Sequence, residues 1–172
     1  MSWWMALLFF LPAGVANATP VVANKIPLLR DWHTPLDFGV SLHNKRLLGK
    51  NKTWRGLLTG SVIAGFTALA LSPIVHYDTS LPGVFGLGFI MGFGALFGDA
   101  IESIIKRQKG IAAGHSWFPF DQIDYIIGGL LFLAPFSSLN WANVGLIFMV
   151  FFGLHLVVAY IAYLLGLKDK PI

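Results

Sequence analysis

The chain has 172 residues, of which 56% are hydrophobic and only 12% are charged. Its mean hydropathy is +0.70, and a soluble domain would carry about twice this share of charged residues. The composition excludes an ordinary soluble globular protein and indicates a polytopic membrane protein. The lack of cysteine excludes disulfides, thiolate catalysis and cysteine-based metal sites. The net charge of +4 needs no nucleic-acid partner, because basic loops facing anionic lipid headgroups account for it.

Apolar stretches predict an all-α fold, a polytopic membrane bundle of five transmembrane helices. In chain order they cover Trp3–Ala18, Leu57–Val75, Val84–Ile105, Ile123–Phe136 and Val144–Leu167. A spanning helix needs about 20 residues, although tilt and flanking residues relax this length, so the first and fourth stretches are short. No repeat or linker divides the chain, and we expect a single membrane-embedded domain over residues 1–172.

The first stretch has two interpretations. Its segment Ala16-Asn17-Ala18 resembles the cleavage site of a signal peptide. However, it lacks a positively charged n-region, and cleavage would leave the most basic loop outside the cell. A retained helix is therefore the stronger interpretation.

The basic residues predict the orientation, because loops rich in Lys and Arg remain in the cytoplasm. All 12 Lys and Arg lie between the first two stretches, after the third, or in the C-terminal tail. The connections 76–83 and 137–143 carry none. We therefore expect the N-terminus outside, the C-terminus in the cytoplasm, and both charged loops on the cytoplasmic side.

The long loop of residues 19–54 contains three prolines and no apolar period, so it is expected to be mostly irregular. Glycine is frequent in the second and third stretches, and close helix packing is the expected reason.

One run, Gly98–Asp124, contains most of the polar chemistry. Asp99, Glu102, Ser103, Lys106 and Arg107 follow at i, i+3, i+4, i+7 and i+8, which is one face of a helix. Beyond a loop, Asp121 and Asp124 form a second acidic pair at the start of the fourth stretch. Ionisable groups at bilayer depth are costly and rarely lack a use, so this clustering predicts a polar site.

Two acidic pairs that face each other would suit a hard divalent cation. Oxygen ligands without cysteine favour Mg²⁺ over Zn²⁺, and Mg²⁺ usually works with phosphates. Basic side chains that could bind phosphates lie nearby, namely Lys50, Lys52, Arg55, Lys106 and Arg107. The pattern indicates phosphoryl-type chemistry at the membrane surface. Interfacial ion pairs, charge at a helix N-terminus and membrane anchoring are the alternative interpretations of the same residues.

The run GDAIESIIKR (98–107) followed by PFDQID (119–124) resembles the membrane cytidylyltransferases that make CDP-activated lipids. Bacterial members show G-D-x-x-E-S-x-x-K-R and a later D-R-x-D, in which Gln122 here replaces the arginine. The bacterial Lys-Asp pair and His-Gly-Gly stretch are absent. The shorter archaeal CDP-archaeol synthase family is similar over almost the entire chain, through LPAGVANATP (11–20), PLDFG (35–39) and LLGKNKTWRG (47–56) as well.

That resemblance implies Mg²⁺-dependent transfer of CMP from CTP to 2,3-bis-(O-geranylgeranyl)-sn-glycerol 1-phosphate on the cytoplasmic side of the cell membrane, with release of pyrophosphate. The implied residues fall into three sets. The catalytic set is Asp99, Asp121, Asp124 and Lys106; the cofactor-binding set is Asp37, Gly39, Lys52, Thr53, Arg55, Glu102 and Arg107; the metal ligands are Asp99, Glu102, Asp121 and Asp124.

Two points stay open at this level. Lys52 and Arg55 would clamp the nucleotide and Lys106 and Arg107 the lipid phosphate, but the two assignments could be exchanged. The oligomeric state is not predicted.

Two other functions fit the sequence less well. A small ion-coupled transporter would use the carboxylates for a coupling ion, but its inverted repeats are not visible. A CDP-alcohol phosphotransferase would need a D-G-x-x-A-R run, which is absent.

Overall fold

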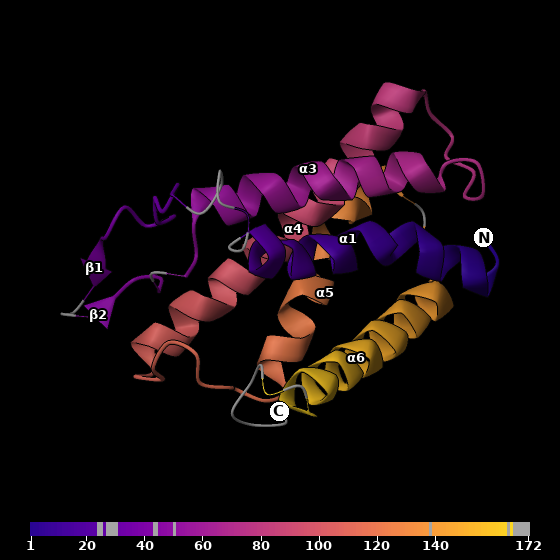
Figure 1. The fold of residues 1–172 in the computed structure, drawn as a ribbon. Helices are drawn as coiled ribbons and strands as arrows, with labels where there is room; N and C mark the ends of the chain where they lie inside the picture. The colour runs from indigo at the N-terminus through magenta and orange to yellow at the C-terminus, as the bar shows by residue number, and fades with distance from the viewer. Residues whose placement is uncertain are drawn as a thin grey trace.

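A computed structural model of the chain describes residues 1–23, 26, 31–42, 45–49, 51–137, 139–164 and 166. The fold is mostly helical (Figure 1). Its elements are α1 (Trp3–Ala23), β1 (Ser41–Leu42), β2 (Lys45–Arg46), α3 (Trp54–Leu71), α4 (Leu81–Gln108), α5 (Phe120–Leu133), the 3₁₀ helix η1 (Ala134–Phe136) and α6 (Trp141–Leu164). Each of the five apolar stretches predicted from the sequence forms a helix at its place in the chain.

Four of these helices, α1, α3, α4 and α6, are long and apolar enough to cross a membrane. The chain is therefore a multi-pass membrane protein. Helix α5 differs, because its 14 residues extend about 21 Å at 1.5 Å per residue, less than the hydrocarbon core of about 30 Å. The predicted count of five spans thus depends on how α5 and η1 sit in the bilayer.

Helix α4 lies at the centre of the bundle. It packs against α1 and α3 on one side and against α5 on the other, while α6 lies at the periphery against α5 and α1 (Figure 1). The largest fully buried side chains include Phe10 on α1, Met91 on α4, Ile126 on α5 and Ile147 on α6. Phe10 meets Phe151 edge to face, with ring centroids 5.1 Å apart. Helix α1 is thus part of the core, which supports its interpretation as a retained helix.

Close helix packing at glycine is confirmed. A Cβ on Gly88 would lie 2.6 Å from the Ala64 carbonyl oxygen, and one on Gly92 would lie 2.5 Å from the Ala64 Cβ. These distances are far inside van der Waals contact, so α3 and α4 approach as closely as glycine allows. Gly86 is different, since a Cβ there would meet nothing within 4 Å.

The loop between α1 and α3 contains more structure than the sequence predicted. Strands β1 and β2 pair antiparallel, with Ser41 opposite Arg46. Leu36 N donates to Lys52 O at 2.9 Å, and Trp54 N donates to Thr34 O at 3.0 Å. These bonds join the PLDFG segment to the residues that enter α3. Two-residue strands are too short to give a period-2 pattern, which is why no strand was expected.

Candidate active site

Three carboxylates meet at the polar end of α4. Asp99 and Glu102 come from α4 and Asp124 from α5, and one oxygen of each lies within 4.8 Å of the others. Glu102 is buried, while Asp99 and Asp124 are partly buried. Residues separated by up to 25 positions in sequence are therefore brought into one small acidic group.

Glycine contacts between α4 and α5 bring these carboxylates together. A Cβ on Gly98 would lie 2.4 Å from the Asp124 carbonyl oxygen, and one on Gly128 would lie 2.2 Å from the Gly94 carbonyl oxygen. Backbone touches backbone at this seam, which no residue larger than glycine permits without a shift. Because Gly98 immediately precedes Asp99, the contact fixes the separation of the carboxylates on the two helices.

The middle of the polar stripe of α4 faces the interior. Glu102, Ser103 and Lys106 are buried, whereas Ile101 and Ile105 on the opposite face are 44% and 42% exposed. The Glu102 carboxylate is therefore held inside the bundle, while Asp99 and Asp124 stay partly accessible.

Asp121, the fourth carboxylate predicted as a metal ligand, has a different set of contacts. It does not belong to the three-carboxylate group in the described part of the chain. Its carboxylate accepts hydrogen bonds from Lys106 Nζ at 2.5 Å and from Trp117 N at 2.6 Å. Both oxygens are thus engaged, one by a cation and one by the backbone of the loop after α4. The i, i+3 spacing with Asp124 is compatible with this pairing as well as with the predicted ligand role.

Two lysines flank the carboxylates from different elements. Lys52, in the loop before α3, forms an ion pair with Asp99. Lys106, one turn beyond Glu102 on α4, lies 3.6 Å from Glu102 Oε1 in addition to its bond with Asp121. The acidic group therefore has a cation on each side, which is an arrangement suited to anions with several phosphates.

The PLDFG segment is ordered by its aspartate. Asp37 accepts hydrogen bonds from Gly39 N at 2.9 Å and Leu48 N at 2.8 Å, and Arg46 lies 3.4 Å from Oδ1. Burial alone would raise the pKa of Asp37, but these bonds and the Arg46 charge together lower the pKa below its ordinary value. Gly39 has φ +86°, a conformation that favours glycine. In the structure both residues shape the loop.

The remaining predicted residues lie close to the entrance of α3 or the end of α4. Thr53 is the N-cap of α3, and its hydroxyl accepts from Gly56 N at 3.2 Å. Arg55, in the first turn, is only 4% exposed. Arg107 lies in the last turn of α4, next to Lys106. Lys50 falls outside the described residues.

Sequence reasoning missed three contributors. Trp117 holds Asp121 through its backbone N–H, Arg46 holds Asp37, and Lys45 Nζ donates to the Gln108 carbonyl oxygen at 2.8 Å. The last contact ties the β1–β2 hairpin to the end of α4. Main-chain donors and long-range pairs of this kind leave no pattern in a single sequence.

The group of Asp99, Glu102 and Asp124 fits a hard divalent cation. All three ligands are carboxylate oxygens, the type that Mg²⁺ and Ca²⁺ prefer. The Oε1 atom of Glu102 is buried and accepts no hydrogen bond from the described residues. Lys106 Nζ is 3.6 Å away, beyond hydrogen-bond distance, so a bound metal ion would give this buried acceptor a closer partner.

Comparison with known proteins gives a consistent result. The family model of the CarS-like CDP-archaeol synthases matches residues 3–172. A CDP-archaeol synthase of Thermofilum pendens is 35% identical over 96% of this chain and 79% of its own length. One of Thermococcus kodakarensis is 32% identical over 99% of both chains.

A solved structure described as an intramembrane enzyme for archaeal membrane lipids biosynthesis superposes with a TM-score of 0.76. It is 30% identical, and the match covers 89% of this chain and 91% of the other. Its fold agrees with the membrane helices described above. The chain therefore belongs to the CDP-archaeol synthase family and is an enzyme of CTP-dependent cytidylyl transfer in archaeal lipid synthesis.

Proposed function

We propose that the enzyme transfers CMP from CTP to 2,3-bis-(O-geranylgeranyl)-sn-glycerol 1-phosphate, with Mg²⁺ held by Asp99, Glu102 and Asp124. The observation that carries the proposal is the meeting of these three carboxylates between two lysines. Substrates with several phosphates need a metal and cations together, and this site has ligands and cations for both tasks.

The chemistry is an in-line displacement at phosphorus. An oxygen of the lipid phosphate forms a bond to the α-phosphorus of CTP, and the bond from that phosphorus to the β-phosphate oxygen breaks. Pyrophosphate leaves with the bonding electron pair. The nucleophile is already anionic, so it needs positioning and charge screening more than a base. No residue is therefore assigned as a general base.

The side chains would have separate roles in this reaction. Bound Mg²⁺ would neutralise charge on the triphosphate and on the departing pyrophosphate. Lys52 and Lys106, on either side of the carboxylates, would each hold phosphate oxygens, with Arg55 and Arg107 extending the two cationic groups. Asp121 would keep Lys106 in place through the 2.5 Å bond. Asp37 and Gly39 would line the nucleotide pocket by shaping the loop, and Thr53 would fix the entry of α3.

The membrane arrangement follows from the charges. We propose that α5 together with η1 forms a fifth span, that the N-terminus lies outside, and that the active site and the C-terminus face the cytoplasm. The support is that all 12 Lys and Arg lie in segments assigned to one side. CTP is then available from the same side as the charged site. We also propose that residues 1–172 form one domain, because α1 and α6, near the two ends, share a core.

An ion-coupled transporter is the weaker alternative. It would give a use to the carboxylates, but not to Lys52 and Lys106 lying in contact with them. The family match also does not favour transport.

The proposal is tested with purified protein, radiolabelled CTP, Mg²⁺ and the geranylgeranylated ether-lipid phosphate, followed by lipid extraction. Label in a CDP-lipid that disappears with EDTA is the expected result. Absence of labelled lipid, from protein shown to be folded, would reject the proposed reaction and make ion flux the next assay.

A further inference from the structure

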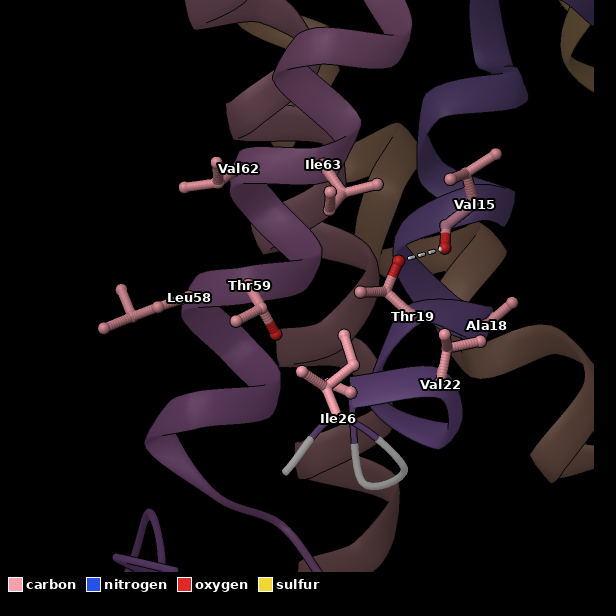
Figure 2. Close-up of a pocket in the computed structure, with 10 residues that line it drawn as sticks. Val15, Ala18, Thr19, Val22, Ile26, Leu58, Thr59, Val62 and Ile63 are labelled. Atoms are coloured by element: carbon pink, nitrogen blue, oxygen red, sulfur yellow. Dashed lines mark hydrogen bonds between the residues drawn. The ribbon is translucent and has the colours of Figure 1, made fainter. Parts of the chain in front are cut away.

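An apolar groove of about 570 Å³ follows the outer side of the seam between α1 and α3. Figure 2 shows its walls, with Val15, Thr19 and Val22 on α1 and Thr59 and Ile63 on α3. The volume is within the range of about 300–1,000 Å³ that is usual for ligand pockets. This groove has no role in the site described above.

The groove opens toward lipid and is closed at its base. On the inner side of the seam, a Cβ on Gly60 would lie 3.0 Å from the Ala16 carbonyl oxygen, and one on Gly56 would lie 3.3 Å from Pro20 Cβ. On the outer side the lining residues are accessible, and Ile63 is 43% exposed. A hydrocarbon chain could therefore enter sideways from the bilayer without opening the bundle.

The side chains that line the groove offer a hydrocarbon surface to a ligand. Its two hydroxyl groups donate to the backbone of their own helices, Thr19 to Val15 O at 2.8 Å and Thr59 to Arg55 O at 2.7 Å (Figure 2 shows the first). All other lining side chains are aliphatic. Such a surface suits an apolar chain and gives little to a polar headgroup.

One end of the groove leads to the charged site. Arg55, Leu58, Thr59 and Val62 follow at i, i+3, i+4 and i+7 on α3, so they share one helix face. Arg55 is thus about one turn, or about 5.4 Å, from the groove. It is also three residues from Lys52, which pairs with Asp99. A ligand with an apolar chain and an anionic head could occupy groove and site together.

We propose that this groove holds the headgroup-proximal part of a prenyl chain of the lipid substrate, with the lipid phosphate on the Arg55 side of the carboxylates. The inference rests on the proposed function. From Val15 to Val22, α1 advances about 10 Å, so the rest of the chain extends into the bilayer. The assignment leaves Lys106 and Arg107 for the nucleotide phosphates, the reverse of the arrangement first expected from the sequence.

The occupant could also be a chain of an ordinary bilayer lipid, and photocrosslinking separates the two sources. The probe is the geranylgeranylated ether-lipid phosphate with a diazirine on its first isoprene unit, added to protein in vesicles of a saturated ether lipid. We expect attachment within residues 15–23, at residue 26 or within residues 58–63, and we expect excess unlabelled substrate to suppress it. Attachment elsewhere, or attachment that a diazirine-labelled bilayer lipid reproduces and the substrate does not displace, overturns the proposal.

Crosslinking needs no turnover, so the proposed function and the proposed groove can be rejected independently of each other. A wild-type protein that makes no CDP-lipid contradicts the proposed function, whereas an active wild-type protein without crosslinks in the groove contradicts the groove.

Kinetics provide a second test. Ala18→Phe and Ile63→Trp fill the groove at accessible positions, and Val157→Phe adds the same bulk on α6 at a position that is 55% exposed. We expect the groove variants to raise the KM for the prenylated substrate about tenfold, with the KM for CTP within about twofold of wild type, and the α6 variant to match wild type. Equal behaviour of the groove and α6 variants contradicts the proposal.

Discussion

Two closely packed helix pairs of this enzyme, α4–α5 and α1–α3, pack in different ways. At α4–α5, glycines on both helices bring backbone against backbone, and the seam ends in three carboxylates. At α1–α3, the helices touch through Gly60 and Ala16 on the inner side only, and a groove remains outside. A membrane protein cannot use the hydrophobic effect to join helices, so small residues decide where helices meet. The α4–α5 seam thus sets the positions of the charged groups, whereas the α1–α3 seam leaves an apolar groove.

The largest expected effect comes from removing a charge at the end of the α4–α5 seam. Asp124→Asn keeps the shape of the side chain but removes a metal ligand. We expect the rate of CDP-lipid formation to fall about 10³-fold, because the charge stabilisation by a bound metal amounts to several kcal/mol. Asp78→Asn, in the exposed turn after α3, is the control and should keep the wild-type rate. Near-normal turnover of Asp124→Asn at low Mg²⁺ would show that the ligand role is wrong.

The seam itself is tested by adding one methyl group. In Gly98→Ala the new Cβ would lie 2.4 Å from the Asp124 carbonyl oxygen, so α4 and α5 must separate. We expect a loss of about 1–3 kcal/mol in stability and about a 10²-fold loss of activity from misplaced carboxylates. Thermal unfolding and turnover in detergent measure the two effects.

Gly86→Ala is the matched control on the same helix, because its Cβ would meet nothing within 4 Å. If both variants behave alike, then the seam does not position the site.

A smaller effect is expected for the residue that positions Lys106. Asp121→Asn removes the ion pair with Lys106 but leaves Asp99, Glu102 and Asp124 in place. Supporting contacts of this kind usually cost about 10–100-fold in activity when removed. We expect a loss in this range with an unchanged dependence of the rate on Mg²⁺ concentration. A raised Mg²⁺ requirement would instead make Asp121 a ligand.

The smallest effect concerns the PLDFG loop outside the membrane helices. The pKa of Asp37 is lowered in the folded protein, so the ionised form is favoured by folding. Its contribution to loop stability is complete above the ordinary pKa of 3.8 and is lost as the pH falls through the lower folded value. Proteolysis of the loop should therefore be unchanged from pH 7 to pH 5 and should increase only below about pH 4.

Asp37→Asn should increase cleavage at neutral pH as well, because Leu48 N loses a carboxylate acceptor, at a cost of about 1–3 kcal/mol. Cleavage that rises equally between pH 7 and pH 5 in wild type would show that Asp37 does not hold the loop.

The helices and the polar stripe were predictable because they leave periodic signals. Hydropathy identified five helical segments, and the i, i+3, i+4 spacing indicated that Glu102 and Lys106 share one helix face; in the structure both are buried. The contact partners of the glycines were not predictable, since a glycine that meets Asp124 and one that meets nothing look the same in a sequence. Gly98 and Gly86 illustrate this.

The contacts of Asp121 were not predictable for a related reason. Its distance from Asp124 in sequence is compatible with a shared metal, but the rotation of α5 against α4 decides which carboxylate joins Asp99. The structure turns Asp124 toward Asp99 and Glu102 and leaves Asp121 with Lys106. Similarly, the bonds that order Asp37 come from backbone N–H groups, which every residue but proline carries and which no composition reveals.

The central claim is that Asp99, Glu102 and Asp124, brought together at the α4–α5 seam, form the metal site of a cytidylyltransferase. Titration with Mn²⁺, followed by electron paramagnetic resonance in wild type, Asp124→Asn, Asp121→Asn and Asp78→Asn, tests it most directly. The account predicts that binding is lost in Asp124→Asn and retained in the other two variants. Wild-type affinity in Asp124→Asn, or loss of binding in Asp121→Asn alone, would contradict it.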